Sequence, residues 1–121
     1  MEVYESNIGE GNTSVKLTAR LLGGDFVVFV YNKNAHIGAV AVGEYDLSNK
    51  RASTSVITRL GHKEDIVAQK AAYLISNYTK KAVCVVAGMH IDNITRDEIK
   101  QLVENSHKLV EDFISKGCKI S

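Results

Sequence analysis

Two polar segments of this sequence contain the side chains best suited to bind a ligand or transfer a proton, and each follows a strand-like run. The first segment, GMHIDNIT at 88–95, places His90 and Asp92 two residues apart, so both side chains point to one side of an extended chain. A carboxylate beside an imidazole orients the ring for proton transfer or for ligand binding. A simpler interpretation is that Asp92 and Asn93 only form the turn before the next helix.

The second segment, Gly61-His62-Lys63, follows the strand-like run 53–60 and leads into a helix. The unpaired backbone N–H groups at a helix N-terminus favour anions, and Lys63 adds a positive charge. The segment is therefore typical of a site that holds a phosphate or a carboxylate. The alternative is that Gly61 permits the turn while His62 and Lys63 are solvated, since short patterns that contain glycine are common.

A third histidine, His36, precedes a segment of small residues at 37–39. Three histidines could ligate zinc, but the spacing of positions 36, 62 and 90 matches no compact zinc motif, and no metal site is predicted. Nucleophilic catalysis has little support, because Ser53 and Ser55 lie in no Gly-x-Ser-x-Gly elbow. Cys84 lies within a strand-like run, where a thiol behaves as a small apolar group. The sequence therefore predicts no catalytic residues.

Six strand-like segments have to position these side chains. Residues 15–21 alternate between apolar and polar side chains, which is typical of a half-buried strand, and residues 23–25 supply a turn to the β-branched and aromatic run 26–31. The run 82–87 shows little alternation and is predicted to be a central strand. The other strands are expected at 4–8, 36–42 and 52–60.

Two amphipathic helices are predicted. The second begins at a capping box formed by Thr95 and Glu98, and Gly117 can end it in the left-handed conformation. The first runs from 64 to about 80. Five of its residues share one apolar face at helical spacing: Val67, Ala71, Leu74, Ile75 and Tyr78. The inward positions expected in the second helix are Ile99, Leu102, Val103, Ser106, Leu109, Val110, Phe113 and Ile114.

The order of five strands, a helix, a strand and a helix predicts an α+β fold with an about six-stranded, largely antiparallel sheet and both helices packed on one face. With 121 residues, 45% hydrophobic content and no proline, the chain is expected to form a single domain over 1–121.

The formal net charge of +1 argues against a protein that binds nucleic acid or anionic membranes. No leader segment and no apolar run of ~18 residues are present, so a cytoplasmic protein with reduced cysteines is expected.

Four motifs together resemble a known family. They are HIGAV at 36–40, STSV at 53–56, GHK at 61–63 and GMHIDNIT at 88–95. These motifs look like those of the small LpdD-like proteins, which are described as prenylated-flavin chaperones associated with UbiD-type decarboxylases such as gallate decarboxylase. The resemblance runs from about Gly24 to Leu109, and the segment before Gly24 lies outside it. The family's domain is similar to proteasome assembly chaperones, small α+β proteins that act as dimers or higher oligomers and have no active site.

The resemblance implies a non-catalytic chaperone in which a cleft transiently holds prenylated FMN before its transfer to an apo-decarboxylase. The helix N-terminus would hold the phosphate, while His90 and Asp92 could face the isoalloxazine. Tyr31 or Tyr45 could stack on the ring, since the chain has no Trp and only 3 Phe. The implied partners are a second copy in a homodimer and a UbiD-type decarboxylase. The implied cofactor-binding residues are His36, Ser55, Gly61, His62, Lys63, Gly88, His90 and Asp92.

Two other functions are compatible with the sequence. A scaffold or assembly protein without a cofactor would form homo- and hetero-oligomers with an assembly-chaperone-like partner. A small decarboxylase or lyase could use His90 and Asp92 as acid and base, but no nucleophile, metal set or cofactor fingerprint accompanies them. Four small residues of the first helix would permit the close helix contact that a scaffold needs: Ala68, Ala71, Ala72 and Ser76.

Overall fold

The computed structural model describes residues 3–59 and 64–120. Two α-helices and two short 3-10 segments accompany six strands. In chain order the elements are β1 (Val3–Ile8), η1 (Gly11–Thr13), β2 (Val15–Leu22), β3 (Asp25–Tyr31), β4 (Ala39–Asp46), β5 (Arg51–Thr58), α1 (Asp65–Thr79), β6 (Val83–Gly88), α2 (Arg96–Ser115) and η2 (Gly117–Ile120).

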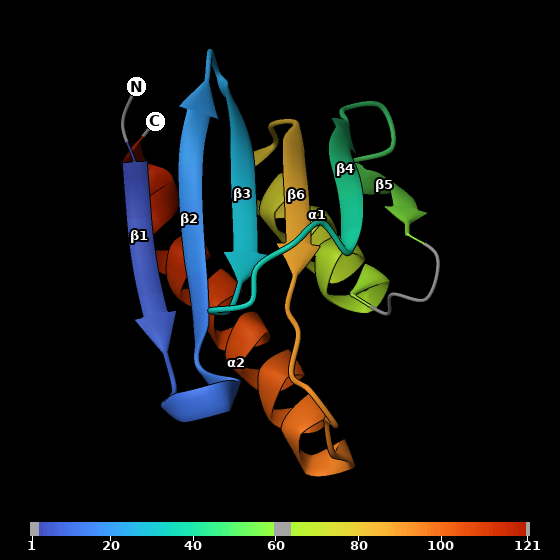
Figure 1. Ribbon diagram of the computed structural model, residues 1–121. Coiled ribbons are helices and arrows are strands. Elements are labelled where there is room, and N and C mark those ends of the chain that lie inside the picture. Colours follow the sequence, from blue (N-terminus) through green and yellow to red (C-terminus); the bar gives the residue numbers. More distant parts are fainter. Residues whose placement is uncertain (1–2, 60–63, 121) are drawn as a thin grey trace.

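All six strands form one sheet in the order β1-β2-β3-β6-β4-β5. β3 and β6 pair in parallel, while every other neighbouring pair is antiparallel. Both helices cover the same face of this sheet, and the other face carries no helix (Figure 1). The predicted α+β fold is therefore confirmed, and so is the central strand, because β6 lies between β3 and β4.

The core lies between the sheet and the two helices, and it is built from alternate residues of each strand. On β2, for example, Val15, Leu17 and Ala19 are fully buried, whereas the residues between them are half-buried or exposed. Successive side chains of a strand point to opposite faces of the sheet, so every second residue is buried against the helices. On α2, Phe113 is fully buried and its ring packs edge-on against Phe26 of β3, with 5.4 Å between centroids.

Helix α1 packs close to the sheet because small residues face each other. A side-chain carbon built at Gly43 of β4 would lie only 2.5 Å from the backbone oxygen of Ala72. Ala72 and Ser76 therefore serve the contact between this helix and the sheet, while Ala71 lines a cavity between α1 and α2. These contacts lie within the chain, whereas the sequence suggested contact with a partner helix. All four of these small residues are buried within the chain itself: Ala68, Ala71, Ala72 and Ser76.

The predicted capping box at the start of α2 is confirmed. The Glu98 N–H donates to the Thr95 hydroxyl at 3.1 Å, and the Thr95 N–H donates to a carboxylate oxygen of Glu98 at 3.0 Å. The prediction that Gly117 ends the helix in the left-handed conformation is wrong, because Gly117 has no positive φ. Its missing side chain instead makes room for the rings of Tyr4 and Phe113, which a side-chain carbon would meet at 2.6–2.7 Å.

Two expected helix faces and one expected strand differ from the structure. Tyr78 of α1 is 60% exposed, and Ile99 and Val103 of α2 are 47% and 39% exposed, so the buried stripes are narrower than predicted. The strand expected at 36–42 begins only at Ala39 and extends to Asp46. Just before β4, the Gly38 N–H still donates to the Ala87 carbonyl of β6 at 3.0 Å, and the side chain of His36 lies against Glu64.

Candidate ligand-binding site

The segment that follows β6 is held in place by a buried amide. Asn32, which is 3% exposed, accepts from the His90 N–H at 3.2 Å and donates from its side chain to the His90 carbonyl at 2.9 Å. Met89 and Ile91 point into the core, so the residues between and after them point outward. The hydrogen bonds between the buried Asn32 side chain and the His90 backbone fix the path of the segment. Because Met89 and Ile91 point inward, the alternating residues His90 and Asp92 point toward solvent.

His90 and Asp92 form an imidazole–carboxylate pair at the end of the central strands. The His90 Nε2 atom lies 2.8 Å from a carboxylate oxygen of Asp92, and the two side chains are 57% and 90% exposed. This confirms the expectation that the two side chains share one side. The Asn34 side chain also donates to the His90 carbonyl at 3.1 Å, which adds a second support from the loop after β3.

A second imidazole–carboxylate pair lies beside the first. The His36 Nε2 atom is 3.3 Å from a carboxylate oxygen of Glu64, and both side chains are mostly buried, at 22% and 12% exposure. The other ring nitrogen of His36 lies 3.2 Å from the Asn34 carbonyl, so oxygen atoms face both nitrogens. Because the carbonyl and the carboxylate both accept, a neutral ring can donate to only one of them, and a doubly protonated ring can donate to both.

Glu64 links this pair to the end of β6. It is the N-cap residue of α1, and its carboxylate accepts from the Met89 N–H at 3.4 Å. Two glycines make room here: a side-chain carbon at Gly88 of β6 would collide with the backbone carbonyl of His36, and one at Gly38, just before β4, would force the Glu64 carboxylate to move. These glycines allow elements far apart in the sequence to meet at one point.

The two imidazole rings are therefore neighbours, with 6.4 Å between their centroids and an angle of 79° between their planes. Together with Asn34 and Asp92 they line an open pocket of about 340 Å³. Two imidazoles, one amide and one carboxylate offer hydrogen-bond donors and acceptors but no strong nucleophile. Such a set can orient a polar ligand and can exchange a proton with it.

A larger depression on the uncovered face of the sheet adjoins this pocket, and His36 lines both. It has a volume of about 590 Å³, within the range of small-molecule sites. Its walls are mainly apolar and aromatic, with Arg20 on β2 as the one arginine. The lining residues are Thr18, Arg20, Phe29, Val30, Tyr31, Ala35, His36, Ile37, Val86 and Gly88.

Four of the residues predicted for the site are brought together: His36, Gly88, His90 and Asp92. Ser55 is not among them, because it is an exposed residue of β5 that lines a separate pocket with Glu44. Three further predicted residues, Gly61, His62 and Lys63, lie outside the residues that the structure describes. Which of the eight bind a ligand stays a prediction.

The two tyrosines proposed to stack on a ring have different surroundings. Tyr31 lines the large depression, and its hydroxyl lies 3.1 Å from that of Thr18. Tyr45 instead lies under the ammonium group of Lys80, which is 5.8 Å from its ring centroid. Only Tyr31 of the two is therefore placed beside the histidines.

Sequence reasoning missed Asn32, Asn34, Glu64 and Arg20. The sequence placed Glu64 only at the start of the first predicted helix, and Arg20 only within the alternating strand at 15–21. No local signal distinguishes a side chain that crosses to another strand from one that is solvated. The two asparagines after β3 did carry a usable signal, since Asn at a strand end often bonds the backbone of a neighbouring segment.

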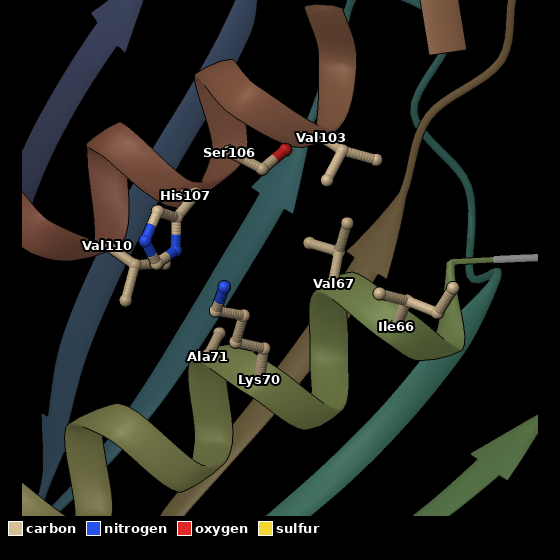
Figure 2. Close-up of a pocket in the computed structure, with 8 residues that line it drawn as sticks. All are labelled: Ile66, Val67, Lys70, Ala71, Val103, Ser106, His107 and Val110. Atoms are coloured by element: carbon tan, nitrogen blue, oxygen red, sulfur yellow. The ribbon is translucent and has the colours of Figure 1, made fainter. Parts of the chain in front are cut away.

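Another small cavity lies between the helices, and it shares no lining residue with the two pockets above. It is lined by both helices, with Lys70 and His107 at its edge (Figure 2). Its volume of about 40 Å³ is close to that of a single water molecule, so it cannot hold a cofactor. His107 is paired there with Glu111 of the same helix at 3.0 Å.

Within residues 3–59 and 64–120, no group of three or more His, Cys, Asp or Glu side chains is arranged to hold a metal ion. In the same part of the chain, no helix has the length and apolar character needed to cross a membrane.

Comparison with known proteins places this geometry in context. A search of curated proteins finds no significant match. Among solved structures, the chain is similar to one in the crystal structure of a novel chaperone complex for yeast 20S proteasome assembly. The TM-score is 0.62 at 14% sequence identity, and the match covers 94% of this chain and 92% of that chain. At this identity the likeness shows a common fold.

A sequence model of the prenylated flavin chaperone LpdD-like domain matches residues 9–117. The match includes β2, so it begins well before Gly24, where the resemblance found from motifs began. The residues that line the histidine pocket and the adjoining depression all fall within the matched range. The chain thus belongs to the family of prenylated flavin chaperone LpdD-like domains.

Proposed function

We propose that this protein is a non-catalytic chaperone that holds prenylated FMN and delivers it to a UbiD-type decarboxylase. The observation that carries the proposal is the depression of about 590 Å³ on the open face of the sheet, which adjoins the two imidazole–carboxylate pairs. Family membership names the ligand class, and the depression supplies a surface of suitable size for it.

The chemistry of the depression suits a prenylated flavin. Phe29, Tyr31 and Val86 offer an apolar and aromatic surface for the flat ring system and its hydrocarbon substituent. His36 and His90 offer hydrogen bonds to polar ring atoms at one end. The phosphate is assigned to the predicted helix N-terminus at Gly61-His62-Lys63, which precedes Glu64 in the chain.

Non-catalytic holding fits the side chains better than a reaction does. The described pocket offers imidazole, amide and carboxylate groups, and His90 and Asp92 are largely exposed. An acid–base pair that drives a reaction is usually enclosed, because desolvation strengthens its electrostatic interactions. An open pocket instead favours loading and release of a ligand that another protein uses.

Flavin titration tests the proposal. Fluorescence of FMN and of prenylated FMN is followed while the protein is added, and saturable binding that favours the prenylated form is expected. His36→Ala and Lys63→Ala should each weaken binding by about tenfold, the effect of losing one good polar contact. The matched control is His107→Ala, which removes a histidine paired with a carboxylate on the helix layer and should leave binding unchanged.

No saturable binding at high micromolar flavin would rule the proposal out. Equal losses in His36→Ala and His107→Ala would also contradict it, because they would show a general effect on folding. Transfer is measured separately, by mixing the loaded protein with an apo-decarboxylase of the UbiD type and following the appearance of decarboxylase activity.

A second candidate function, a scaffold that assembles with an assembly-chaperone-like partner without any cofactor, is favoured by exposed apolar side chains on the helix layer. Ile66, Ile99 and Val103 are 63%, 47% and 39% exposed on α1 and α2. Native mass spectrometry of the protein with the products of neighbouring genes should then show a defined hetero-complex that forms without flavin. A complex that appears only with flavin would favour the first function.

A further inference from the structure

Strand β5 forms one edge of the sheet, and half of its backbone groups face away from the other strands. It pairs only with β4, in an antiparallel register. The residues of such a strand alternately bond the partner strand and face away from it. Arg59 donates its N–H to the Gly38 carbonyl at 3.0 Å, in the register that continues from β5, so every second residue back from Arg59 bonds β4. The residues between them direct their N–H and C=O groups outward: Ala52, Thr54, Val56 and Thr58.

Within residues 3–59 and 64–120, no hydrogen bond reaches these outward backbone groups. In Figure 1, β5 lies at the side of the sheet, with α1 on one face, and no helix or strand that the structure describes lies beyond its outer edge. An open edge of this kind is usually protected by a charge, a proline or a bulge. β5 has eight residues, no proline and no charged residue after Arg51. The edge is therefore suited to accept another strand.

The exposed side chains of β5 form one wall of a polar pocket beside this edge. Ser53 and Ser55 line the pocket together with Glu44 and Asp46 of β4, and its volume is about 440 Å³. Ile57, two residues beyond Ser55, is 74% exposed. The pocket shares no lining residue with the two pockets assigned to the flavin. The motif at 53–56 thus belongs to a separate surface that the proposed function does not use.

Glu44 gives this surface a negative charge that the described residues do not neutralise. It lies directly opposite Ser53 in the register of β4 and β5. No described residue forms an ion pair with Glu44, whereas Asp46 already accepts from the Asn49 amide and the Ser48 N–H. A strand added beside β5 would lie about 10 Å from β4, since neighbouring strands are ~4.8 Å apart. An arginine or lysine on that strand, opposite Ser53, can reach the Glu44 carboxylate because the serine between them is small.

We propose that β5 is the docking strand for an extended segment of a partner protein, which adds to the sheet as a further strand. The segment runs antiparallel to β5, the more stable of the two pairings, and bonds the outward backbone groups. From its N-terminus it presents an apolar residue opposite Ile57, then basic residues opposite Ser55 and Ser53. It carries no basic residue opposite Arg51, where like charges would repel. The backbone bonds supply affinity, while Glu44 and the exposed Ile57 supply the preference for this pattern.

Binding of a synthetic peptide tests the proposal. The probe is the fluorescein-labelled peptide TITRTRT, whose residues would pair with β5 from Thr58 back to Ala52. Fluorescence anisotropy should show saturable binding with a Kd of roughly 100 μM, since a short peptide loses conformational freedom when it binds. The peptide TITETET, with glutamates in place of the arginines, should bind at least about tenfold more weakly. TITRTRT methylated at the backbone nitrogens of its third and fifth residues, which face β5, should not bind.

A proline on the edge strand tests the proposal from the protein side. Thr54→Pro removes an outward N–H that β4 does not use, so the fold should be kept while peptide binding weakens by at least about tenfold. Glu5→Pro is the matched control, because Glu5 is an exposed residue of the other edge strand, β1, and its N–H also faces outward. Circular dichroism shows whether both variants are folded. Equal binding by folded Thr54→Pro and Glu5→Pro would overturn the proposal, and the methylated peptide decides if Thr54→Pro does not fold.

Charge reversal at Glu44 tests the register of the added strand. Glu44→Lys should weaken binding of TITRTRT by about tenfold and make TITETET the tighter ligand. An unchanged order of the two peptides would overturn the role of Glu44. No saturable binding at about 1 mM peptide would overturn the proposal, as would equal binding of the methylated peptide. A wild-type dimer that Thr54→Pro dissociates but TITRTRT does not would place a second copy on β5 and would overturn a partner segment of this chemistry.

Discussion

The two faces of β3 are almost equally apolar in sequence but have different surroundings. Phe26, Val28 and Val30 face the helices and are 0–1% exposed. Val27, Phe29 and Tyr31 alternate with them, face the open side and are only half-buried. Apolar character alone therefore does not decide which side chains form the core. The covered face stabilises the fold, and the open face is left with apolar surface that can bind a ligand or a partner.

The largest difference between the two faces should appear in phenylalanine truncations on one strand. Phe26→Ala should lower the free energy of unfolding by about 3–5 kcal/mol, because the lost ring leaves a cavity against Phe113. Phe29→Ala, on the open face of the same strand, should cost about 1 kcal/mol or less in the isolated chain. Urea denaturation monitored by circular dichroism measures both. Equal losses would contradict a one-sided core.

A smaller effect is expected where the helix layer approaches the sheet most closely. Gly43→Ala should cost about 1–3 kcal/mol, because a methyl group 2.5 Å from the Ala72 carbonyl has to push α1 off the strand. Gly24→Ala is the control, since a side-chain carbon there meets no atom within 4 Å. Thermal unfolding of both variants should show a lowered midpoint for the first alone; a normal midpoint for Gly43→Ala would show that α1 shifts freely.

Two substitutions separate the structural part of the segment after β6 from its proposed ligand-binding part. Thr95→Ala removes the cap of α2 and should cost about 1 kcal/mol without changing flavin affinity. His90→Ala should have the reverse effect, weakening flavin binding with little change in stability, since the ring is more than half exposed. A loss of flavin affinity in Thr95→Ala equal to that in His90→Ala would contradict the division.

The smallest effect concerns the β4–β5 turn at the edge of the open face. The Asn49 side-chain amide, which donates to Asp46 at 2.6 Å, and the backbone N–H groups of Asn49 and Ser48 lower the pKa of the Asp46 carboxyl below its usual value of 3.8. A carboxyl whose pKa is lower in the folded than in the unfolded state stabilises the fold at pH values above its unfolded-state pKa. This contribution is lost as the pH falls through its folded-state pKa. Asp46→Asn should therefore slightly lower the urea midpoint at about pH 7 and have no effect at about pH 2. An equal shift at both pH values would show that charge is not involved.

Much of the fold could be predicted from local patterns. The alternation at 15–21 and the capping box at Thr95 and Glu98 led to correct elements, because both depend on residues that are close in the chain. Errors occurred where a distant segment intervened. Gly117 was expected to be left-handed, but the rings of Tyr4 and Phe113 explain its presence. The strand expected from His36 begins only at Ala39, and the His36 side chain lies against Glu64, which is distant in the sequence.

The candidate site was predictable in its parts but not in its assembly. His90 and Asp92 were expected to share one side, and they form a pair at 2.8 Å. Nothing local placed His36 next to them or identified Glu64 as its partner. Ser55, which belongs to one of the recurring motifs, lies at a separate pocket with Glu44. Motif membership thus indicated importance without indicating which residues meet.

The sequence by itself determined which segments are strands and helices, where α2 begins, and which polar residues follow the central strand. These features depend on periodicity and on caps, and their interactions span only a few residues. Only the tertiary structure decided that β6 lies between β3 and β4 and that two histidines from distant segments lie 6.4 Å apart. Those features depend on strand pairing and packing between residues far apart in the chain, and no local pattern specifies the partner of a strand.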